Sequence, residues 1–244
     1  MSVLGRLVRL ALPGVRQVHA QVARYAAEWE AANGVALAGP DQGPRGVVLG
    51  DSTAQGIGAP AWEEGYVGQL HRALNEGAER PWRVVNLSRA GARTADVLDR
   101  QLPALHGLGL DRKPDLGTCA IGANDIVRRS PREVLLDRLR RIMAGLPDRA
   151  VIATIPQGLS PERSEAANRV IRDEAPAAGL VVADVWAATG PPWHGKVAAD
   201  RFHPGALGYA DWAAAFADAL PAALPTRSRD PKQPPHRLGF PGPC

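Results

Sequence analysis

From residue 45 onward, short apolar and β-branched runs alternate with helical patterns. The predicted strands cover residues 46–49, 83–86, 116–121, 150–155 and 180–184. The predicted helices cover residues 65–75, 94–102, 131–146 and 161–178, and one more follows Pro204. Several strand runs are continuously apolar, which is typical of parallel strands covered on both faces. The alternation predicts one α/β domain over residues 45–220, with a parallel sheet and helices on both sides.

A separate helical pattern fills residues 1–34. Apolar side chains recur there at alternating steps of three and four, and arginines lie on the opposite side. We expect Pro13 to kink or divide this helix, and Asn33-Gly34 to end it, because both of these residues tolerate the left-handed conformation of a C-cap. The apolar stripe favours docking of residues 1–32 on the protein's own core or self-association. A basic amphipathic helix could instead make peripheral contact with an anionic membrane.

Composition and charge narrow the class of protein. The chain has 244 residues, of which 45% are hydrophobic and 22% charged, and this excludes a disordered, collagen-like or coiled-coil protein. The formal net charge is +4, but aromatic residues make up only 5% and no basic run is interleaved with them, so nucleic-acid binding is not expected. The two cysteines, Cys119 and Cys244, exclude a disulfide framework and a CxxC zinc site. We expect Cys119 to be a small buried hydrophobe.

The ends of the chain carry no clear membrane or export signal. No run approaches 18 consecutive apolar residues, and arginines interrupt every candidate apolar stretch of a secretory signal. A cytoplasmic location is therefore expected, with peripheral attachment to a membrane as the alternative. Residues 221–244 are rich in proline and arginine without an apolar period, and this composition predicts a disordered or loosely attached tail.

Polar motifs follow the predicted strands at the edge where open α/β sheets bind their ligands. Alone, each motif has an ordinary explanation as a turn or a helix cap. Together they supply the groups that acyl transfer needs, which are a nucleophilic hydroxyl, a base, a carboxylate to orient the base, and donors for an oxyanion. In chain order the motifs are Gly50-Asp51-Ser52, the segment that ends at Gly91, Gly122-Ala123-Asn124-Asp125, and Asp200-Arg201-Phe202-His203.

Each of these groups has a candidate residue. Ser52 supplies the hydroxyl and His203 the base, and Asp200 is close enough in sequence to accept a hydrogen bond from the Nδ1–H of that base. The backbone N–H groups of Ser52 and Gly91 and the side-chain amide of Asn124 can converge as oxyanion donors. The absence of a side chain at Gly91 lets its backbone approach a ligand closely.

With these four blocks, over about residues 46–215, the chain resembles the SGNH hydrolases, also called the GDSL esterase/lipase family. The first block reads Asp-Ser-Thr where many members read Asp-Ser-Leu or Asp-Ser-Ile, and this departure does not touch the nucleophile. The resemblance implies a flavodoxin-like, three-layer α/β/α sandwich with a parallel five-stranded sheet of order 2-1-3-4-5. It also implies a catalytic triad of Ser52, Asp200 and His203, and an oxyanion hole of Ser52, Gly91 and Asn124. No Gly-x-Ser-x-Gly elbow occurs, which disfavours the α/β-hydrolase fold.

The leading hypothesis is a serine hydrolase that cleaves carboxylic esters with small to medium acyl groups through an acyl-enzyme, without a cofactor or a metal. Its substrate would be a small-molecule, lipid or carbohydrate ester. One alternative is an acyl or acetyl transferase, or a carbohydrate deacetylase, with the same triad. Another is a non-catalytic, membrane-associated binding protein, but the intact set of candidate residues counts against it.

Other polar residues near the motifs are interpreted as structural. Asp51 and Asp125 are expected to make local hydrogen bonds, and Asn168 to sit in a helix without a catalytic role. The histidines outside the last block have no spacing that suggests a metal site. Trp186 and Trp193, which precede the last block, either line an acyl or aromatic pocket or only pack their loop.

Overall fold

The computed structural model describes residues 12–38, 43–76, 78–111 and 114–224. Its centre is a parallel five-stranded sheet with the order β2-β1-β3-β4-β5. The strands are β1 (Arg45–Gly50), β2 (Arg83–Asn86), β3 (Leu116–Ala120), β4 (Val151–Ala153) and β5 (Val181–Ala183). The flavodoxin-like order and the parallel pairing expected from the resemblance are therefore confirmed.

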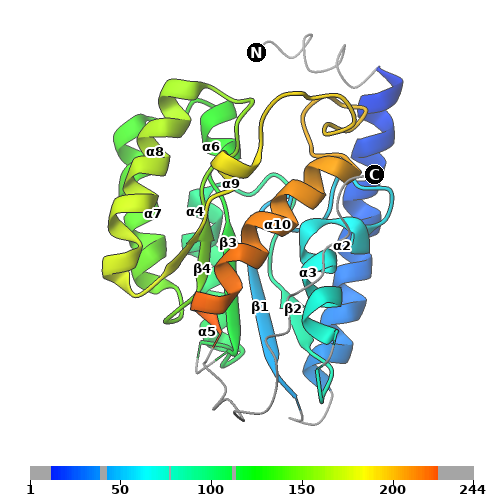
Figure 1. The fold of residues 1–244 in the computed structure, drawn as a ribbon, viewed down its shortest axis with the longest axis vertical. Helices are drawn as coiled ribbons and strands as arrows, with labels where there is room; N and C mark the ends of the chain where they lie inside the picture. Colours follow the sequence, from blue (N-terminus) through cyan, green and yellow to red (C-terminus); the bar gives the residue numbers. More distant parts are fainter. Residues whose placement is uncertain (1–11, 39–42, 77, 112–113, 225–244) are drawn as a thin grey trace, which may run out of the picture.

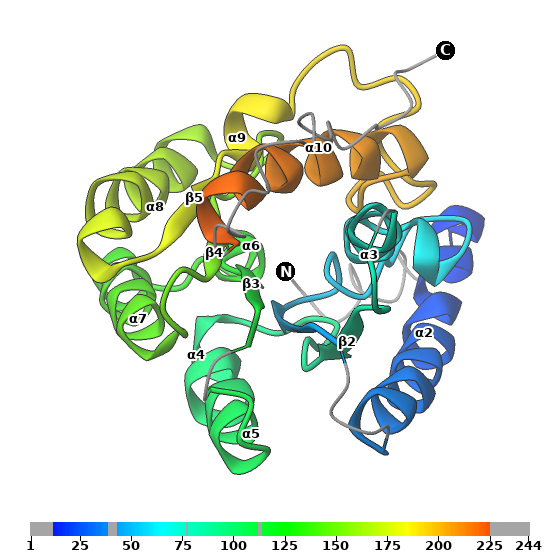
Figure 2. The same ribbon diagram turned by 60° about the horizontal axis from the view of Figure 1, so that its bottom comes forward.

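Helices cover both faces of this sheet (Figure 1). One face carries α3 (Tyr66–Asn75) and α10 (Ala206–Ala223). The other face carries α4 (Thr94–Asp96), α5 (Leu102–Gly107), α7 (Arg132–Gly145) and α8 (Pro161–Glu174), with a π-helical turn (Val97–Gln101) that joins α4 to α5. Figure 2 shows these two layers on opposite sides of the strands. The short helices α6 (Ala123–Val127) and α9 (Val185–Ala188) begin at the carboxyl ends of β3 and β5.

The core lies in two layers because successive strand residues point to opposite faces. Val47 and Leu49 of β1 belong to the cluster beneath α5, α7 and α8, whereas Val48 between them belongs to the cluster beneath α3 and α10. All three side chains are buried. The continuously apolar strands of the sequence are thus explained by burial on both sides.

Helix α2 (Pro13–Ala38) runs beside the edge strand β2 (Figure 2). It begins at Pro13, where the missing N–H has no intrahelical partner to lose. The predicted end at Asn33-Gly34 is wrong, because the helix continues for another turn and buries Ala36. Asn33 does not cap the helix, since its side chain hydrogen bonds to the backbone of β2. Residues 1–11 of the predicted N-terminal helix lie outside the described residues.

The described part of the apolar stripe on α2 faces the protein's own core. Val18, Tyr25 and Trp29 are all buried there. Across the described residues, no helix combines the length and the apolar character that crossing a bilayer requires.

The start of the predicted tail is also wrong. Helix α10 continues through Pro221 to Ala223, so residues 221–223 are helical. The guanidinium of Arg149 donates hydrogen bonds to the carbonyl oxygens of Ala223 (3.1 Å) and Leu224 (2.8 Å) at the end of this helix. Those carbonyls have no partner within the helix, so Arg149 stabilises its last turn. The rest of the predicted tail, residues 225–244, lies outside the described residues.

Candidate active site

Ser52 lies in a tight loop at the carboxyl end of β1 and is only 5% exposed. Its carbonyl oxygen accepts hydrogen bonds from the N–H groups of Gln55 and Ile57, which fold the loop back on itself. Gly58 in the same loop has φ +101°, and a β-carbon there would lie 2.8 Å from the β-carbon of His203. Only glycine therefore lets the loop of Ser52 pack directly against His203.

Three side chains form a continuous hydrogen-bonded chain. The Ser52 Oγ lies 2.9 Å from His203 Nε2, and His203 Nδ1 lies 2.6 Å from Asp200 Oδ2. The other oxygen of Asp200 accepts hydrogen bonds from the backbone N–H groups of Phe202 and His203, both at 3.0 Å. The backbone thus fixes the carboxylate, and the carboxylate in turn orients the imidazole.

The charge of Asp200 is stabilised in this position. Burial raises the pKa of its carboxyl, but the hydrogen bonds from the His203 ring and from the two backbone N–H groups outweigh this effect and lower the pKa overall. Asp200 is therefore an anion at neutral pH. An anion beside Nδ1 holds the proton on that nitrogen and leaves Nε2 free to accept a proton from Ser52.

Asn124 lies at the start of α6, directly after β3. Its side-chain Nδ2 donates hydrogen bonds to the Ala92 carbonyl oxygen (3.0 Å) and to Asp51 Oδ2 (3.3 Å). These two contacts tie Asn124 to the loop that carries Gly91 and to the residue that precedes Ser52. Gly91 itself has φ +76°, a left-handed conformation that glycine adopts without strain.

Two further carboxylates of the motifs hold the loops in place. Asp51 is buried and accepts hydrogen bonds from the N–H (2.9 Å) and the hydroxyl (2.8 Å) of Thr53. Burial raises the pKa of Asp51, and the hydrogen bonds from Thr53 offset this only in part. Asp125 accepts hydrogen bonds from the backbone N–H and hydroxyl of Thr94 and from the hydroxyl of Ser130. Asp51 thus makes the local contacts expected of it, whereas Asp125 bonds locally to Ser130 and also to Thr94, which is 31 residues away.

A pocket of about 320 Å³ opens beside Ser52 and His203. Its walls are largely apolar, and a Lys196–Asp211 ion pair (2.8 Å) contributes polar groups. Trp193 lines this pocket, whereas Trp186 is not among the lining residues and instead offers its carbonyl oxygen to Gln157. The main apolar side chains of the walls are those of Leu159, Trp193, Val197, Phe202 and Trp212.

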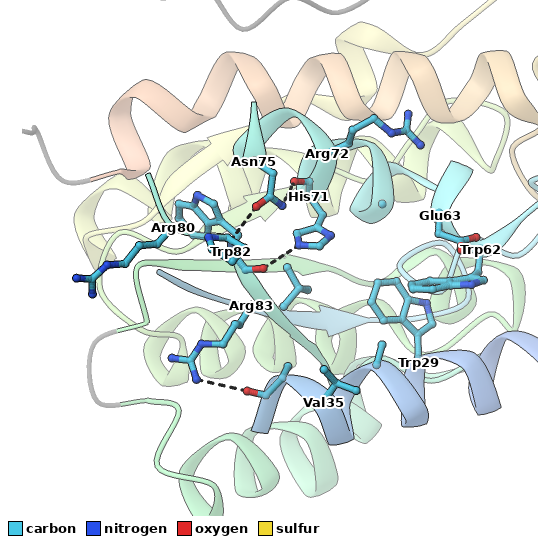
Figure 3. Close-up of a pocket in the computed structure, with 15 residues that line it drawn as sticks. Trp29, Val35, Trp62, Glu63, His71, Arg72, Asn75, Arg80, Trp82 and Arg83 are labelled. Carbon is cyan, nitrogen blue, oxygen red and sulfur yellow. Dashed lines mark hydrogen bonds between the residues drawn. The ribbon is translucent and has the colours of Figure 1, made fainter. Parts of the chain in front are cut away.

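A larger hollow of about 970 Å³ lies elsewhere, between α2, α3 and β2 (Figure 3). It contains His71, but the Nε2 atom of this histidine is hydrogen bonded to the Trp82 carbonyl oxygen at 2.9 Å. The described residues that line it include no serine, threonine, cysteine or tyrosine. Although this hollow is larger, it lacks a nucleophile, so the pocket beside Ser52 is the candidate active site.

The remaining candidates have structural surroundings. Asn168 is buried and bonds the backbone of Ile155 with both ends of its amide. Cys119 is fully buried in β3, and burial raises the pKa of its thiol to about 12. In the part of the chain that the structure describes, no three acidic, histidine or cysteine side chains are grouped as a metal site would require.

One contribution to the site was missed by the sequence analysis. Side chains of α2 hydrogen bond to the backbone of the loop that follows Ser52. The apolar stripe indicated that this helix could dock on the core. The apolar stripe did not indicate which loop the helix would contact, because the spacing of apolar residues shows which face of a helix is buried but not which segment covers that face.

The sheet order and the helices on both faces define an α/β/α sandwich. The polar groups at the carboxyl edge of the sheet are those that a hydrolase would need. A model of the GDSL-like lipase/acylhydrolase family matches residues 48–210, and the chain belongs to this family. It is accordingly a carboxylic ester hydrolase. Among curated proteins, none matches the sequence.

Solved structures support the fold. The structure of TesA is 25% identical with a TM-score of 0.61, and the match covers 74% of this chain and 99% of TesA. A lipase/acylhydrolase from Enterococcus faecalis is 23% identical with a TM-score of 0.57, covering 77% of this chain and 100% of that one. Axe2, an acetylxylan esterase from Geobacillus stearothermophilus, is 20% identical with a TM-score of 0.55, covering 76% and 98%.

Proposed function

We propose that this protein is a serine hydrolase that cleaves carboxylic esters with small to medium acyl groups through a Ser52 acyl-enzyme. The observation that carries the proposal is the unbroken chain of hydrogen bonds from Asp200 through His203 to Ser52. A buried hydroxyl beside an oriented imidazole is the arrangement that activates a serine nucleophile.

In the first half of the reaction, His203 Nε2 takes the hydroxyl proton while Ser52 Oγ attacks the ester carbonyl carbon. The carbonyl π electrons move onto its oxygen, and a tetrahedral intermediate forms. When the intermediate collapses, the bond to the alcohol breaks, and His203 gives its proton to the departing alcohol oxygen. Asp200 stabilises the imidazolium while it holds that proton.

In the second half, water replaces the alcohol. His203 takes a proton from water while the water oxygen attacks the acyl carbon of the acyl-enzyme. The bond from that carbon to Ser52 Oγ then breaks, and His203 returns the proton to Ser52. The backbone N–H groups of Ser52 and Gly91 and the amide of Asn124 are the donors proposed for the oxyanion in both halves.

The size of the pocket supports the proposed acyl range. Its volume of about 320 Å³ lies near the lower end of the roughly 300–1,000 Å³ that is usual for small-molecule sites. Apolar walls such as Leu159 and Val197 suit an alkyl chain. We therefore expect activity toward short and medium chains and a decline toward octanoate.

The test is hydrolysis of p-nitrophenyl esters from acetate to octanoate, together with labelling by a fluorophosphonate. Wild type is expected to hydrolyse the shorter esters and to be labelled at Ser52, and Ser52→Ala is expected to do neither. Ser164→Ala is the matched control, because Ser164 is buried in α8 and its hydroxyl has no hydrogen-bond partner among the described residues.

Two results would contradict the proposal. If wild type is not labelled, Ser52 is not an activated nucleophile. If it is labelled at Ser52 but hydrolyses no ester of the series, the nucleophile stands and the proposed substrate class is wrong.

A further inference from the structure

Helix α2 lies outside residues 48–210, the part of the chain that the family model matches. The match with TesA covers 99% of TesA and 74% of this chain. The contacts of α2 therefore have to be explained from this chain alone.

The middle of α2 is hydrogen bonded to the loop that carries Ser52. Gln21 accepts a hydrogen bond from the Gly58 N–H at 2.8 Å and donates one to the Ala59 carbonyl oxygen at 3.0 Å. The Tyr25 hydroxyl donates to the same carbonyl oxygen at 2.9 Å. These bonds satisfy backbone groups of the loop that has to hold Ser52 in place.

One turn further along the helix, Trp29 continues this contact. Its indole Nε1 donates to the Gln55 carbonyl oxygen at 3.2 Å, and its ring packs edge-on against Trp62, with 4.5 Å between the ring centres. Gln55 and Ile57 are the two residues whose N–H groups donate to the Ser52 carbonyl oxygen. Both are thus in contact with α2, since Ile57 packs with Tyr25.

The first turn of α2 touches the other catalytic loop. A β-carbon at Gly14 would lie 2.4 Å from the Ala199 carbonyl oxygen, so helix and loop are in contact through backbone atoms. Ala199 directly precedes Asp200. Ala198, one residue earlier, packs on the cluster of Val18, Tyr25 and Ile57.

We propose that α2 is a positioning element of the active site, with Gly14, Gln21 and Tyr25 as positioning residues. The helix holds the loop of Ser52 and the loop of Asp200 and His203 in the relative position that the 2.9 Å contact between Ser52 and His203 requires. This inference rests on the proposed function of those three side chains.

The effect of α2 on the rate comes from the geometry of the reacting groups and not from the stability of the fold. Proton transfer from Ser52 to His203 needs a hydrogen bond of about 2.6–3.2 Å. A displacement of about 1 Å at a reacting group can cost roughly 100-fold in rate. The two loops lie far apart in the sequence, and α2 contacts both.

Two glycines of α2 provide a matched test. Alanine in place of either glycine raises the helix propensity, and at Gly34 the new β-carbon meets nothing within 4 Å. At Gly14 it would collide with Ala199 and displace the segment that leads into Asp200. We expect Gly14→Ala to lower kcat for p-nitrophenyl butyrate by about 10- to 100-fold with little change in KM. Gly34→Ala is expected to match wild type.

A shift of the first turn of α2 would relieve the collision in Gly14→Ala and hide its effect. A second variant therefore tests the contact farther along the helix. Gln21→Ala combined with Tyr25→Phe removes three hydrogen bonds to the Ser52 loop and introduces no collision. We expect it to lower kcat by about 10-fold or more. Gln17→Ala, at an exposed position of the same helix, is its control.

The decisive measurement separates two quantities. One is the rate constant with which fluorophosphonate labels the protein, and the other is the number of labelled sites per molecule at the end of the reaction. A positioning role predicts that this rate constant falls in both variants while the number of labelled sites is unchanged. Fewer labelled sites with an unchanged rate constant would show a purely structural role and overturn the inference, as would wild-type rates in both variants. If wild type itself is not labelled, it is the proposed function that fails.

Discussion

The side-chain amide of Asn124 has two hydrogens, and both already have acceptors in the structure. The shorter bond goes to the Ala92 carbonyl oxygen and the longer one, at 3.3 Å, to Asp51 Oδ2. An oxyanion beside Ser52 would need one of these hydrogens. The bond to Asp51 is the weaker of the two by its length, so it is the one expected to open or to be shared when charge develops on the substrate.

We expect Asn124→Ala to lower kcat for short p-nitrophenyl esters by about 10²–10³, the usual effect of losing one oxyanion donor. The reason is that this donor acts on charge that develops only in the transition state. Circular dichroism and thermal unfolding would establish that the fold is intact. An unchanged kcat in the folded variant would remove Asn124 from the oxyanion hole.

Asp200 makes stability depend on pH with a defined sign. Its pKa is lowered in the folded state, below the unfolded value of about 4. Ionised Asp200 therefore adds stability above that pH, and this contribution is lost as the pH falls through the folded-state pKa.

We expect the stability difference between wild type and Asp200→Asn to be larger at pH 7 than at pH 3 in urea unfolding. Asp218→Asn is the control, because Asp218 is an exposed carboxylate of α10. A difference that stays the same at both pH values would show that the charge of Asp200 contributes nothing to folding.

At the scale of elements, Asn168 connects α8 to the chain that leaves β4. Its Oδ1 accepts a hydrogen bond from the Ile155 N–H (2.6 Å), and its Nδ2 donates to the Ile155 carbonyl oxygen (2.9 Å). Ile155 directly precedes Pro156, Gln157 and Gly158, which line the active-site pocket. The interpretation of Asn168 as structural therefore holds, and the contact supports one wall of the pocket.

We expect Asn168→Ala to destabilise the fold by about 1–3 kcal/mol for each buried backbone group of Ile155 that it leaves unpaired. Asn168→Asp keeps an acceptor for the N–H but sets a buried carboxylate oxygen against the Ile155 carbonyl oxygen. Urea unfolding at pH 7 should therefore place its stability at or below that of Asn168→Ala. Equal stability of all three proteins would mean that these two bonds do not hold the segment.

Helix ends show where sequence patterns reach their limit. Helix α8 ends at Glu174 and Pro176 begins a 3-10 turn, Pro176–Ala178, so the single helix that was predicted is divided. Pro221, by contrast, lies inside α10. Arg149, far away in the sequence, binds the last carbonyls of α10, and no local pattern around Pro221 contains that information. The end of a helix is decided by its tertiary partners as well as by its own residues.

At the scale of the whole molecule, the site lies where the strand order changes direction. The chain moves from β1 to the edge at β2 and then returns to β3 on the other side of β1. Ser52 follows β1 and Asn124 lies in the first turn of the helix after β3, so the crevice between these two strands brings both together. The order of motifs along the chain indicated this edge as the candidate site.

The sequence predicted the alternation of elements, the strand positions to within one or two residues and the contacts of Ser52 with His203 and of His203 with Asp200. It did not predict the packing of α2 on two loops or the size of the pocket. Both depend on long-range contacts, such as Gly14 against Ala199 and Trp193 in the pocket wall, that no short segment encodes.

The hydrogen bonds of Asn33 have a consequence for how copies of this molecule meet. β2 is an edge strand, and the outward N–H and C=O groups of its last residue, Asn86, are where a strand from another chain could begin to pair. The Asn33 amide occupies both groups, at 2.7 and 2.8 Å, and so takes the place of a neighbouring strand's peptide group. One asparagine on a helix thereby occupies the position at which a strand from another chain would extend the sheet.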